Sequence, residues 1–308
     1  DRDLVATEDG LLRLLPYLSA QATLSIDCEG ADLSKGSWRD GVQLDDPGVP
    51  FHGRLCLMQI GTPAGEAYAV DILELGPRAF DLGLRRLLED AAITKVVHDF
   101  RQDADALWHQ FRVQVQGLFD CQLCDVLLRR LRGHRTTYVL GGARLLGEHG
   151  VELITIDGVG ELTQEKKLDI HQRFSEDRHL WERRPLPEEM VQYARADVLP
   201  LLRLHGRLAA ALAAEVGGEA AAAHLVRVGS HIYATDFASR TTCCCRLCCD
   251  AAANARFDGC RLFSTMASCV DPATMQRLWR PEDARTLSPP GPSKFRVNEH
   301  DESVPLAQ

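Results

Sequence analysis

The segment Ala22-Thr-Leu-Ser-Ile-Asp-Cys-Glu-Gly30 is the most informative part of the chain, because an apolar run ends there in two acids separated by one residue. Successive side chains of a β-strand point to opposite faces, so Asp27 and Glu29 project together and Cys28 turns away. Two carboxylates then share one face at a strand end. Such a pair is also common on solvated surfaces, so its meaning depends on partners elsewhere in the chain.

Three further residues are the expected partners of this pair. Tyr193 and Asp197 are four residues apart, and on a helix that spacing places them one above the other on one face. Asp103 is expected in the first turn of a helix that follows a strand at residues 94–98, where strand ends open toward a ligand crevice. Each signal has a simpler explanation, since helix dipoles favour acids in the first turn and core tyrosines often neighbour exposed acids. Their joint occurrence favours one shared acidic site.

A cluster of acids needs a chemical reason, because two like charges at about 4 Å repel by roughly 4 kcal/mol at an effective dielectric near 20. A divalent cation turns that repulsion into affinity, and Mg²⁺ is usually held by a few carboxylates together with phosphate oxygens. Two such ions, roughly 3.5 to 4 Å apart, stabilise the attacking and leaving oxygens of a displacement at phosphorus. A tyrosine hydroxyl can orient the attacking water or help to deprotonate it. The pattern therefore predicts a metal-dependent phosphodiesterase.

Residues from about 20 to 214 resemble the DEDD superfamily of 3′-5′ exonucleases, in the tyrosine-containing branch with ribonuclease D. Stand-alone eukaryotic exonuclease-domain proteins and the exonuclease domain of Egalitarian are the more similar groups. The stretches that carry the resemblance are Ile26-Asp-Cys-Glu-Gly30, Gly53-Arg-Leu-Cys-Leu-Met-Gln-Ile60, Lys95-Val-Val-His-Asp99, Leu118-Phe-Asp-Cys-Gln122 and Trp181-Glu-Arg-Arg-Pro185.

The resemblance implies roles for the five site residues. Asp27, Glu29 and Asp197 would hold a first Mg²⁺ or Mn²⁺ ion. Asp27 would bridge to a second ion, which Asp103 would help to place through its waters, and Tyr193 would position the nucleophilic water. Some relatives lack a motif acid or the tyrosine and bind RNA without cutting it, whereas this chain has all five.

Three basic residues are predicted to contact nucleic acid. His98 matches a position that precedes the motif aspartate in relatives, and the alternative for it is a hydrogen bond that caps the strand. Arg183 and Arg184 form a basic pair that could track a single strand entering the site. Their alternative is a solvated surface.

The expected fold class is α/β, with a ribonuclease H-like mixed sheet flanked by helices and a helical C-terminal part. The expected helices cover residues 9–19, 80–89, 103–111 and about 121–131, and the expected strands end at Glu29 or cover residues 54–60, 67–72, 94–98 and 117–120. The predicted division is an exonuclease domain at residues 1–216, ending before Gly217-Gly218, and a Cys-rich, partly disordered tail of unknown role at residues 217–308.

Four features fall outside the resemblance or carry a simpler explanation. The polar segment 31–52 is expected to be a disordered insertion, with a gate for substrate as the alternative. In the tail, Cys243-Cys-Cys-Arg-Leu-Cys-Cys249 with Cys260 and Cys269 leaves a Zn²⁺ site, palmitoylation and disorder open. Cys121 and Cys124 are expected to be small buried residues. Gln59 is expected to satisfy backbone groups in the sheet.

Composition narrows the function classes. A net charge of −9 argues against a protein that coats nucleic acid without specificity, because phosphate neutralisation needs a basic surface. Eleven cysteines in irregular clusters suggest reduced thiols in an intracellular protein, cytoplasmic or nuclear. No apolar run approaches the 18 residues or so of a membrane span. The first residue is Asp1, so a targeting segment can be missing.

The sequence therefore predicts a 3′-5′ exonuclease that acts on the 3′ end of single-stranded nucleic acid with two divalent ions. RNA is favoured over DNA by resemblance alone. One alternative is a catalytically weak or inactive RNA-binding adaptor with the same fold. Another is a metal-binding module formed by the cysteines of the tail. Protein partners are not indicated.

Overall fold

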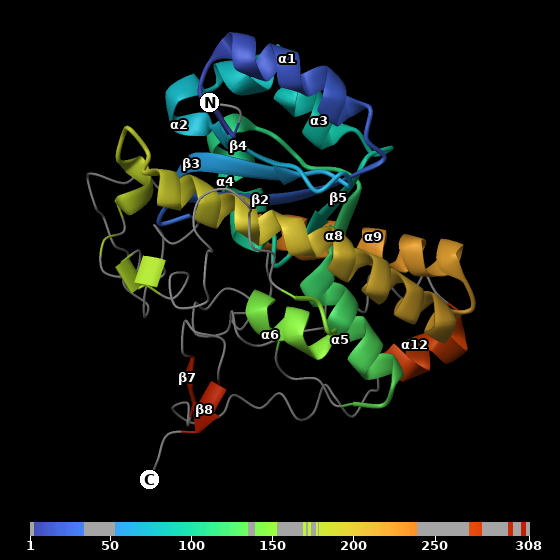
Figure 1. Ribbon diagram of the computed structural model, residues 1–308. Coiled ribbons are helices and arrows are strands. Elements are labelled where there is room, and N and C mark those ends of the chain that lie inside the picture. The colour runs from blue at the N-terminus through green and yellow to red at the C-terminus, as the bar shows by residue number, and fades with distance from the viewer. Residues whose placement is uncertain are drawn as a thin grey trace.

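The computed structural model of the chain describes residues 3–33, 53–134, 139–152, 169–170, 172–173, 177, 179–238, 271–278, 295–297 and 303–305. A six-stranded sheet lies at its centre, in the strand order β1-β4-β3-β2-β5-β6 (Figure 1). The strands are β1 (Leu4–Val5), β2 (Thr23–Ala31), β3 (Arg54–Gly61), β4 (Ala67–Asp71), β5 (Thr94–Val97) and β6 (Leu118–Asp120). β3 is antiparallel to β2 and β4, and the other pairs are parallel.

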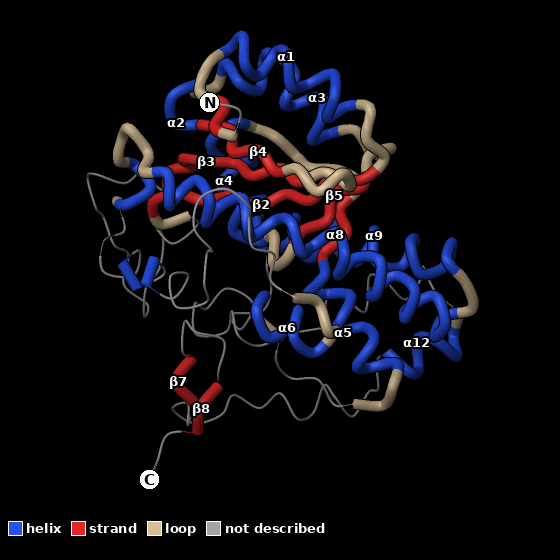
Figure 2. The backbone as a smooth tube through the Cα atoms, viewed as in Figure 1, coloured by secondary structure: helices blue, strands red, loops and turns tan. Residues whose placement is uncertain are grey.

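Helices flank this sheet and confirm the predicted α/β class (Figure 2). They are α1 (Glu8–Ser19), α2 (Ile72–Leu75), η1 (Phe80–Leu84), α3 (Arg85–Glu89), α4 (Arg101–Phe111), α5 (Cys121–Leu131), α6 (Gly142–Glu148), η2 (Leu180–Glu182), α8 (Glu188–Val216), α9 (Glu219–Ala238) and α12 (Pro272–Leu278). A separate two-stranded sheet pairs β7 (Phe295–Val297) with β8 (Ser303–Pro305).

One face of the sheet is covered by α1, α3 and α4. In β2 the alternate residues Leu24, Ile26 and Cys28 are buried in the hydrophobic core on this face. α1 contributes four leucines to the same core at the spacing of one helical stripe, Leu11, Leu14, Leu15 and Leu18. α1 and α3 lie together above the sheet in Figure 1. The residues of β2 that alternate with Leu24, Ile26 and Cys28 therefore point to the opposite face of the sheet.

The opposite face is crossed by α8, a single helix of 29 residues that packs against β2, β3 and β4. Cys56 and Leu57 of β3 form a buried cluster with Met190, Val191 and Ala194 of α8. The first half of α8 therefore lies directly over the acidic end of β2.

α9 continues the packed body beyond residue 216, at which the sequence analysis divides the chain. α8 does end there, since Gly217 takes a left-handed conformation with φ 84°. Nevertheless α9 packs against α4, α8 and β6, and it buries Leu225 and Val226 in a cluster shared with α5 and α8. The buried apolar residues of α9 thus join it to the sheet and helices before it.

Two predictions concern residues that are not described. They are the insertion, most of which is residues 34–52, and the cysteine cluster of the tail with Cys260 and Cys269. Among the described helices, none combines the length and the apolar character that a membrane crossing requires.

Candidate metal centre

Three carboxylates meet between β2 and α8. Each of Asp27, Glu29 and Asp197 offers an oxygen, and these three oxygens all lie within 4.8 Å of one another. All three side chains are partly buried. The alternation of β2 explains the first two, because Cys28 between them is buried on the opposite face. The residues that sequence spacing placed on one face of a strand therefore do share that face.

The regular pairing of β2 is interrupted immediately after this pair. The pairing of β2 with β3 shifts register between Glu29 and Gly30. A Cβ atom at Gly30 would lie 2.1 Å from the carbonyl oxygen of Arg54, so only glycine fits this close approach of two backbones. Bulges of this kind are frequent beside active sites, where they redirect a side chain or end the pairing.

Asp103 lies in the first turn of α4, as predicted, and is 7% exposed. Burial raises the pKa of the Asp103 carboxyl well above its usual range, and the charge of Asp27 raises that pKa further. Asp103 therefore lies close enough to Asp27 to repel it, but it is not part of the group of three oxygens. Asp103 is thus a fourth buried acid beside the group of three carboxylates.

Tyr193 lies one helical turn before Asp197 on α8. Burial raises the pKa of its phenol, and the neighbouring charges of Asp197, Glu29 and Asp27 add to that increase. Its ring packs at 6.1 Å, centroid to centroid, from the buried ring of Trp181. The hydroxyl is thus held as a neutral group beside the three carboxylates.

The position of α8 depends on Arg195, which the sequence analysis did not single out. Its Nε donates to the carbonyl oxygen of Ala67 at 2.7 Å, and its Nη1 donates to Asp3 at 2.6 Å and to Gln192 at 3.1 Å. These bonds join the helix to β4 and to the start of the chain. Since Arg195 lies between Tyr193 and Asp197, it fixes the turn that presents both.

Arg184 is held within the protein, although the sequence predicted a contact with nucleic acid. Its guanidinium makes a two-pronged ion pair with Asp71, with Nε–Oδ2 and Nη2–Oδ1 distances of 2.8 and 2.6 Å, and Nη1 donates to the carbonyl oxygen of Trp181. Asp71 is 1% exposed, so this pair is buried structure. Arg183, by contrast, is 65% exposed and pairs with Asp177.

His98 favours the alternative that the sequence left open. Its Nε2 lies 3.0 Å from the carbonyl oxygen of Leu140, to which Gln122 also donates. This hydrogen bond ties the end of β5 to the residues before α6. A role for His98, Arg183 or Arg184 in nucleic-acid binding stays a prediction.

Two expectations about buried polar residues have different outcomes. Cys121 and Cys124 are fully buried free thiols, and burial raises the pKa of each. Gln59 was expected to satisfy backbone groups, and this is wrong for the described residues: its amide atoms are buried and none of those residues hydrogen-bonds them. Gln59 pairs with Asp27 across β2 and β3, so the amide lies next to the acidic cluster.

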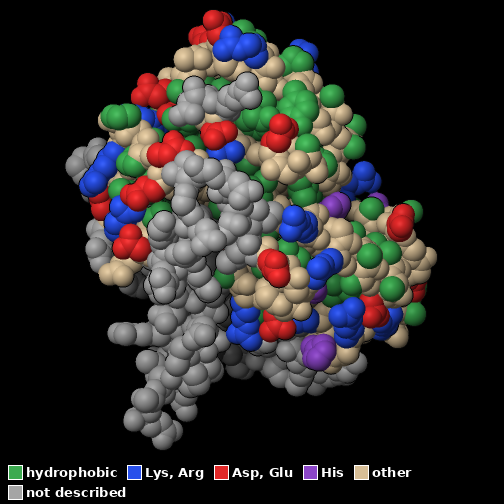
Figure 3. All heavy atoms as spheres, in the orientation of Figure 1, with side chains coloured by type: hydrophobic (Ala, Val, Ile, Leu, Met, Phe, Trp, Pro, Cys, Tyr) green, Lys and Arg blue, Asp and Glu red, His purple; other side chains and the backbone are tan. Residues whose placement is uncertain are grey.

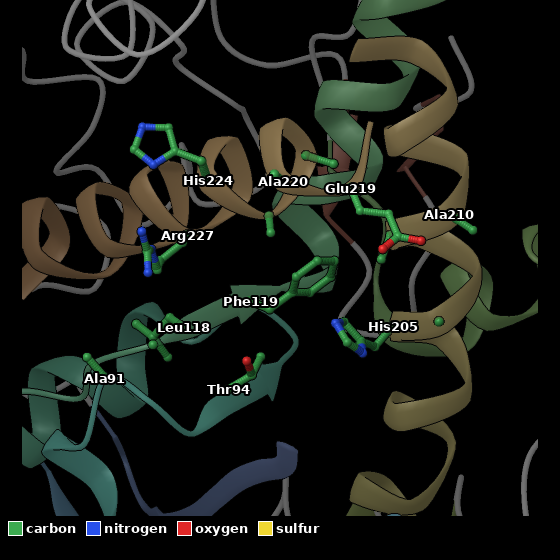
Figure 4. A pocket seen from close by; sticks show the side chains of 15 residues that line it. Ala91, Thr94, Leu118, Phe119, His205, Ala210, Glu219, Ala220, His224 and Arg227 are labelled. Atoms are coloured by element: carbon green, nitrogen blue, oxygen red, sulfur yellow. The ribbon is translucent and has the colours of Figure 1, made fainter. Parts of the chain in front are cut away.

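A separate groove of about 440 Å³ lies between α8, α9 and the first residues of β5 and β6 (Figure 4). The rings of Phe119 and His205 meet edge to face in its wall, with 4.4 Å between centroids, and burial lowers the pKa of His205. His224 and Arg227 line it from α9. None of the five predicted site residues lines this groove.

Basic side chains are visible on the lower right of Figure 3, where Figure 1 places α5, α8, α9 and α12. Several arginines of α5 and its C-terminal end are engaged by neighbours. Arg129 pairs with Asp125, Arg130 donates to the carbonyl oxygen of Leu278, and Arg132 pairs with Glu215. The first contact lies within α5, and the other two join α5 and its C-terminal end to α12 and α8, which is the structural alternative to a surface that tracks nucleic acid.

Known proteins match this chain in sequence and in fold. The mouse (Mus musculus) piRNA biogenesis protein EXD1 is 37% identical over 111 residues, which are 36% of this chain and 16% of that protein. Exosome complex component 10 of Rattus norvegicus is 34% identical over 158 residues, which are 51% of this chain and 15% of that protein. Among solved structures, Trypanosoma brucei RNase D has a TM-score of 0.61 at 21% identity, and the match covers 89% of this chain and 80% of that one.

These matches differ in what they show. The structural match shows a shared fold, and the chain spans less than a fifth of the length of the two mammalian relatives. The model of the 3′-5′ exonuclease family matches residues 45–213, which include Asp103, Tyr193 and Asp197. That match covers more than half of the 308 residues, and the chain belongs to the 3′-5′ exonuclease family.

Proposed function

We propose that the chain is a metal-dependent exonuclease that hydrolyses phosphodiester bonds at the 3′ end of single-stranded nucleic acid, with RNA preferred. The observation that carries this proposal is the meeting of the Asp27, Glu29 and Asp197 oxygens within 4.8 Å. Membership of the exonuclease family supports the reaction class. The preference for RNA is supported by the names of relatives, a piRNA biogenesis protein, an exosome component and a ribonuclease D.

The donor set fits a hard divalent cation. Carboxylate oxygens are the ligands that Mg²⁺ and Mn²⁺ prefer, and a divalent cation would offset the repulsion among three partly buried carboxylates this close together. Asp27, Glu29 and Asp197 would hold one ion. Asp103, buried beside Asp27, would help to hold a second, with Asp27 shared between the two.

When bound, the ions supply stabilisation of the charge that develops on the phosphoryl oxygens and make a bound water more acidic. The chain supplies position. Tyr193 presents a neutral hydroxyl next to the three carboxylates, where it can hydrogen-bond to a water and aim it at phosphorus. Arg195 keeps Tyr193 and Asp197 in register with β2 by holding the turn between them.

The test is a time course of cleavage on single-stranded RNA and DNA labelled at the 5′ end, with Mg²⁺ or Mn²⁺. EDTA removes the divalent ion, and the Asp27→Asn variant removes one of its proposed ligands. The matched control is Asp81→Asn, which changes an exposed acid on η1. We expect products that shorten from the 3′ end, faster on RNA than on DNA, with the wild type and with Asp81→Asn only.

Two outcomes would contradict this proposal in different ways. Cleavage that persists in Asp27→Asn would remove the site assignment while leaving an exonuclease. RNA binding without cleavage by the wild type would replace the enzyme with an RNA-binding adaptor of the same fold.

A further inference from the structure

The route from β5 to Asp103 runs through a short connection that α9 supports. β5 ends at Val97, and α4 begins at Arg101. α9 packs against α4 and against the edge strand β6, which lies beside β5. The family match ends at residue 213, so this support comes from a segment outside the matched residues.

A single buried carboxylate holds the connection. Asp120 accepts hydrogen bonds from the backbone N–H groups of Asp99 and Phe100, each at 3.2 Å, and also from that of Gln122 at 2.9 Å. It therefore fixes the start of α4 and the start of α5 together. The N–H of Asp120 in turn donates to the hydroxyl of Ser230 on α9 at 2.9 Å. Since β6 is an edge strand, this bond satisfies a donor that no further strand can pair.

The first residue of α4 is fixed from two sides. Arg101 donates from Nε and Nη2 to the carboxylate of Asp99 at 2.5 and 2.8 Å, and its side chain is 11% exposed. The guanidinium carbon lies 4.8 Å from the centre of the Tyr233 ring of α9, in cation–π geometry. The hydroxyl of Tyr233 donates to Gln122 at 3.0 Å.

The connection has an uncommon backbone conformation. Asp99 has a positive φ of 54°, in the left-handed region that few residues other than glycine, asparagine and aspartate adopt. Such a conformation persists only where its surroundings hold it. Here Asp120 holds the backbone of Asp99, and Arg101 holds its side chain. Without the Tyr233 ring, the Arg101 guanidinium would lose one of the two contacts that hold it, and only its ion pair with Asp99 would remain.

We propose that α9 positions Asp103, with Tyr233 as the positioning residue, and that the chain needs this helix to form the second metal subsite. Asp103 follows Arg101 by two residues in the first turn of α4, so rotation of that turn would move its carboxylate relative to Asp27. Tyr233 acts through Arg101. Groups that orient metal ligands from behind affect metal affinity or activity by about 10- to 100-fold when they are removed. This inference rests on the proposed function, because it assigns Asp103 to a metal.

The experiment compares Tyr233→Leu, Tyr233→Phe and Arg227→Ala in the full chain. Tyr233→Phe keeps the ring over Arg101 and loses only the bond to Gln122. Arg227→Ala is the control, since Arg227 is an exposed residue of the same helix. The readouts are the Mg²⁺ concentration that gives half-maximal cleavage and Mn²⁺ binding measured by electron paramagnetic resonance, after circular dichroism has established folding.

For Tyr233→Leu we expect an increase of about 10-fold in the half-maximal Mg²⁺ concentration and weaker binding of the second Mn²⁺ ion, with the first ion bound as in the wild type. Tyr233→Phe should change the Mg²⁺ requirement by less than about threefold, because the cation–π contact persists. Arg227→Ala should match the wild type. If Tyr233→Leu does not fold, Tyr233→Met provides the same test, because the flexible methionine side chain fills an irregular buried space and has no ring to pack against Arg101.

An unchanged Mg²⁺ requirement and two intact Mn²⁺ sites in a folded Tyr233→Leu protein would overturn the positioning role alone. A wild type that neither cleaves nor binds Mn²⁺ would overturn the proposed function, and the positioning role with it. The Mn²⁺ titration of the wild type therefore distinguishes the two failures.

Discussion

Replacing one acid of the metal centre should stabilise the metal-free protein. In Asp197→Asn the side chain keeps its shape and loses its charge, while Asp27 and Glu29 remain. Their oxygens lie no more than 4.8 Å from that of Asp197. At this separation each like-charged pair costs about 3 kcal/mol at an effective dielectric of 20 and about 1 kcal/mol at the dielectric of water.

The three side chains are partly buried, so the relief lies between these limits. Asp197 belongs to two of the three pairs, which gives a stabilisation of about 2 kcal/mol even at the dielectric of water. The unfolded chain separates residues 27 and 197 and does not carry this cost. We therefore expect the free energy of unfolding in EDTA to be higher for Asp197→Asn than for the wild type.

Urea denaturation of both proteins, in EDTA and in millimolar Mg²⁺, provides the assay. Mg²⁺ should stabilise the wild type, because an ion that binds only the folded state adds free energy that grows with its concentration. The variant should gain much less, so the difference seen in EDTA should shrink or reverse. Asp71→Asn is the control of opposite sign, since it leaves the partly buried Arg184 without the carboxylate that binds it in two places and should lose about 3 kcal/mol.

A variant that is less stable than the wild type in EDTA would refute the reasoning. It would mean that the Asp197 carboxylate is held by favourable contacts in the metal-free protein. An equal gain from Mg²⁺ in both proteins would refute the metal site itself.

Three further predictions address the site and the core. Tyr193→Phe should slow cleavage while the affinity for RNA stays within about twofold, because the hydroxyl orients a water and does not bind the RNA. Single-turnover rates and a binding titration would separate the two effects. Burial lowers the pKa of Lys95 from 10.5 to about 8, so its charge should cost the fold about 3 kcal/mol below pH 8, and this cost should fade as pH rises toward 10.5. Lys95→Met should remove that pH dependence, as urea denaturation at pH 7 and pH 10 would measure. If the difference in unfolding free energy between the variant and the wild type is the same at both pH values, the prediction is wrong. Cys121 and Cys124 should resist alkylation in the folded protein, because burial raises the pKa of each thiol, and they should react after denaturation, as peptide mass spectrometry would establish.

Local periodicity explains why much of the fold and site could be predicted. The alternation of side chains along β2 predicted that Asp27 and Glu29 share one face of the strand. The spacing of four residues predicted that Tyr193 and Asp197 share one face of a helix. The apolar runs at residues 54–60 and 67–72 predicted the strands that the structure shows as β3 and β4. These are properties of neighbouring residues, so one sequence is enough to show them.

Contacts between distant residues could not be predicted in the same way. Arg184 was read as part of a basic pair, but its partner Asp71 precedes it by 113 positions. Likewise Tyr233 and Arg101 meet only because α9 folds back along β6 and α4. Nothing in the local sequence of α9, rich in alanine and with few large apolar residues, indicates which surface it covers.

The complete site is larger than the segment that the family model matches. The match begins at residue 45, so Asp27 and Glu29 join Asp197 on the evidence of the geometry, through the position of β2 between β3 and β5. At the other end, α9 follows the last matched residue and supports the turn that carries Asp103. Each of the two proposed metal subsites therefore depends on residues outside the matched segment, one before it and one after it. The proposed functional unit accordingly extends over β2 to α9, because a segment that began at residue 45 would retain Tyr193 and Asp197 without Asp27 and Glu29.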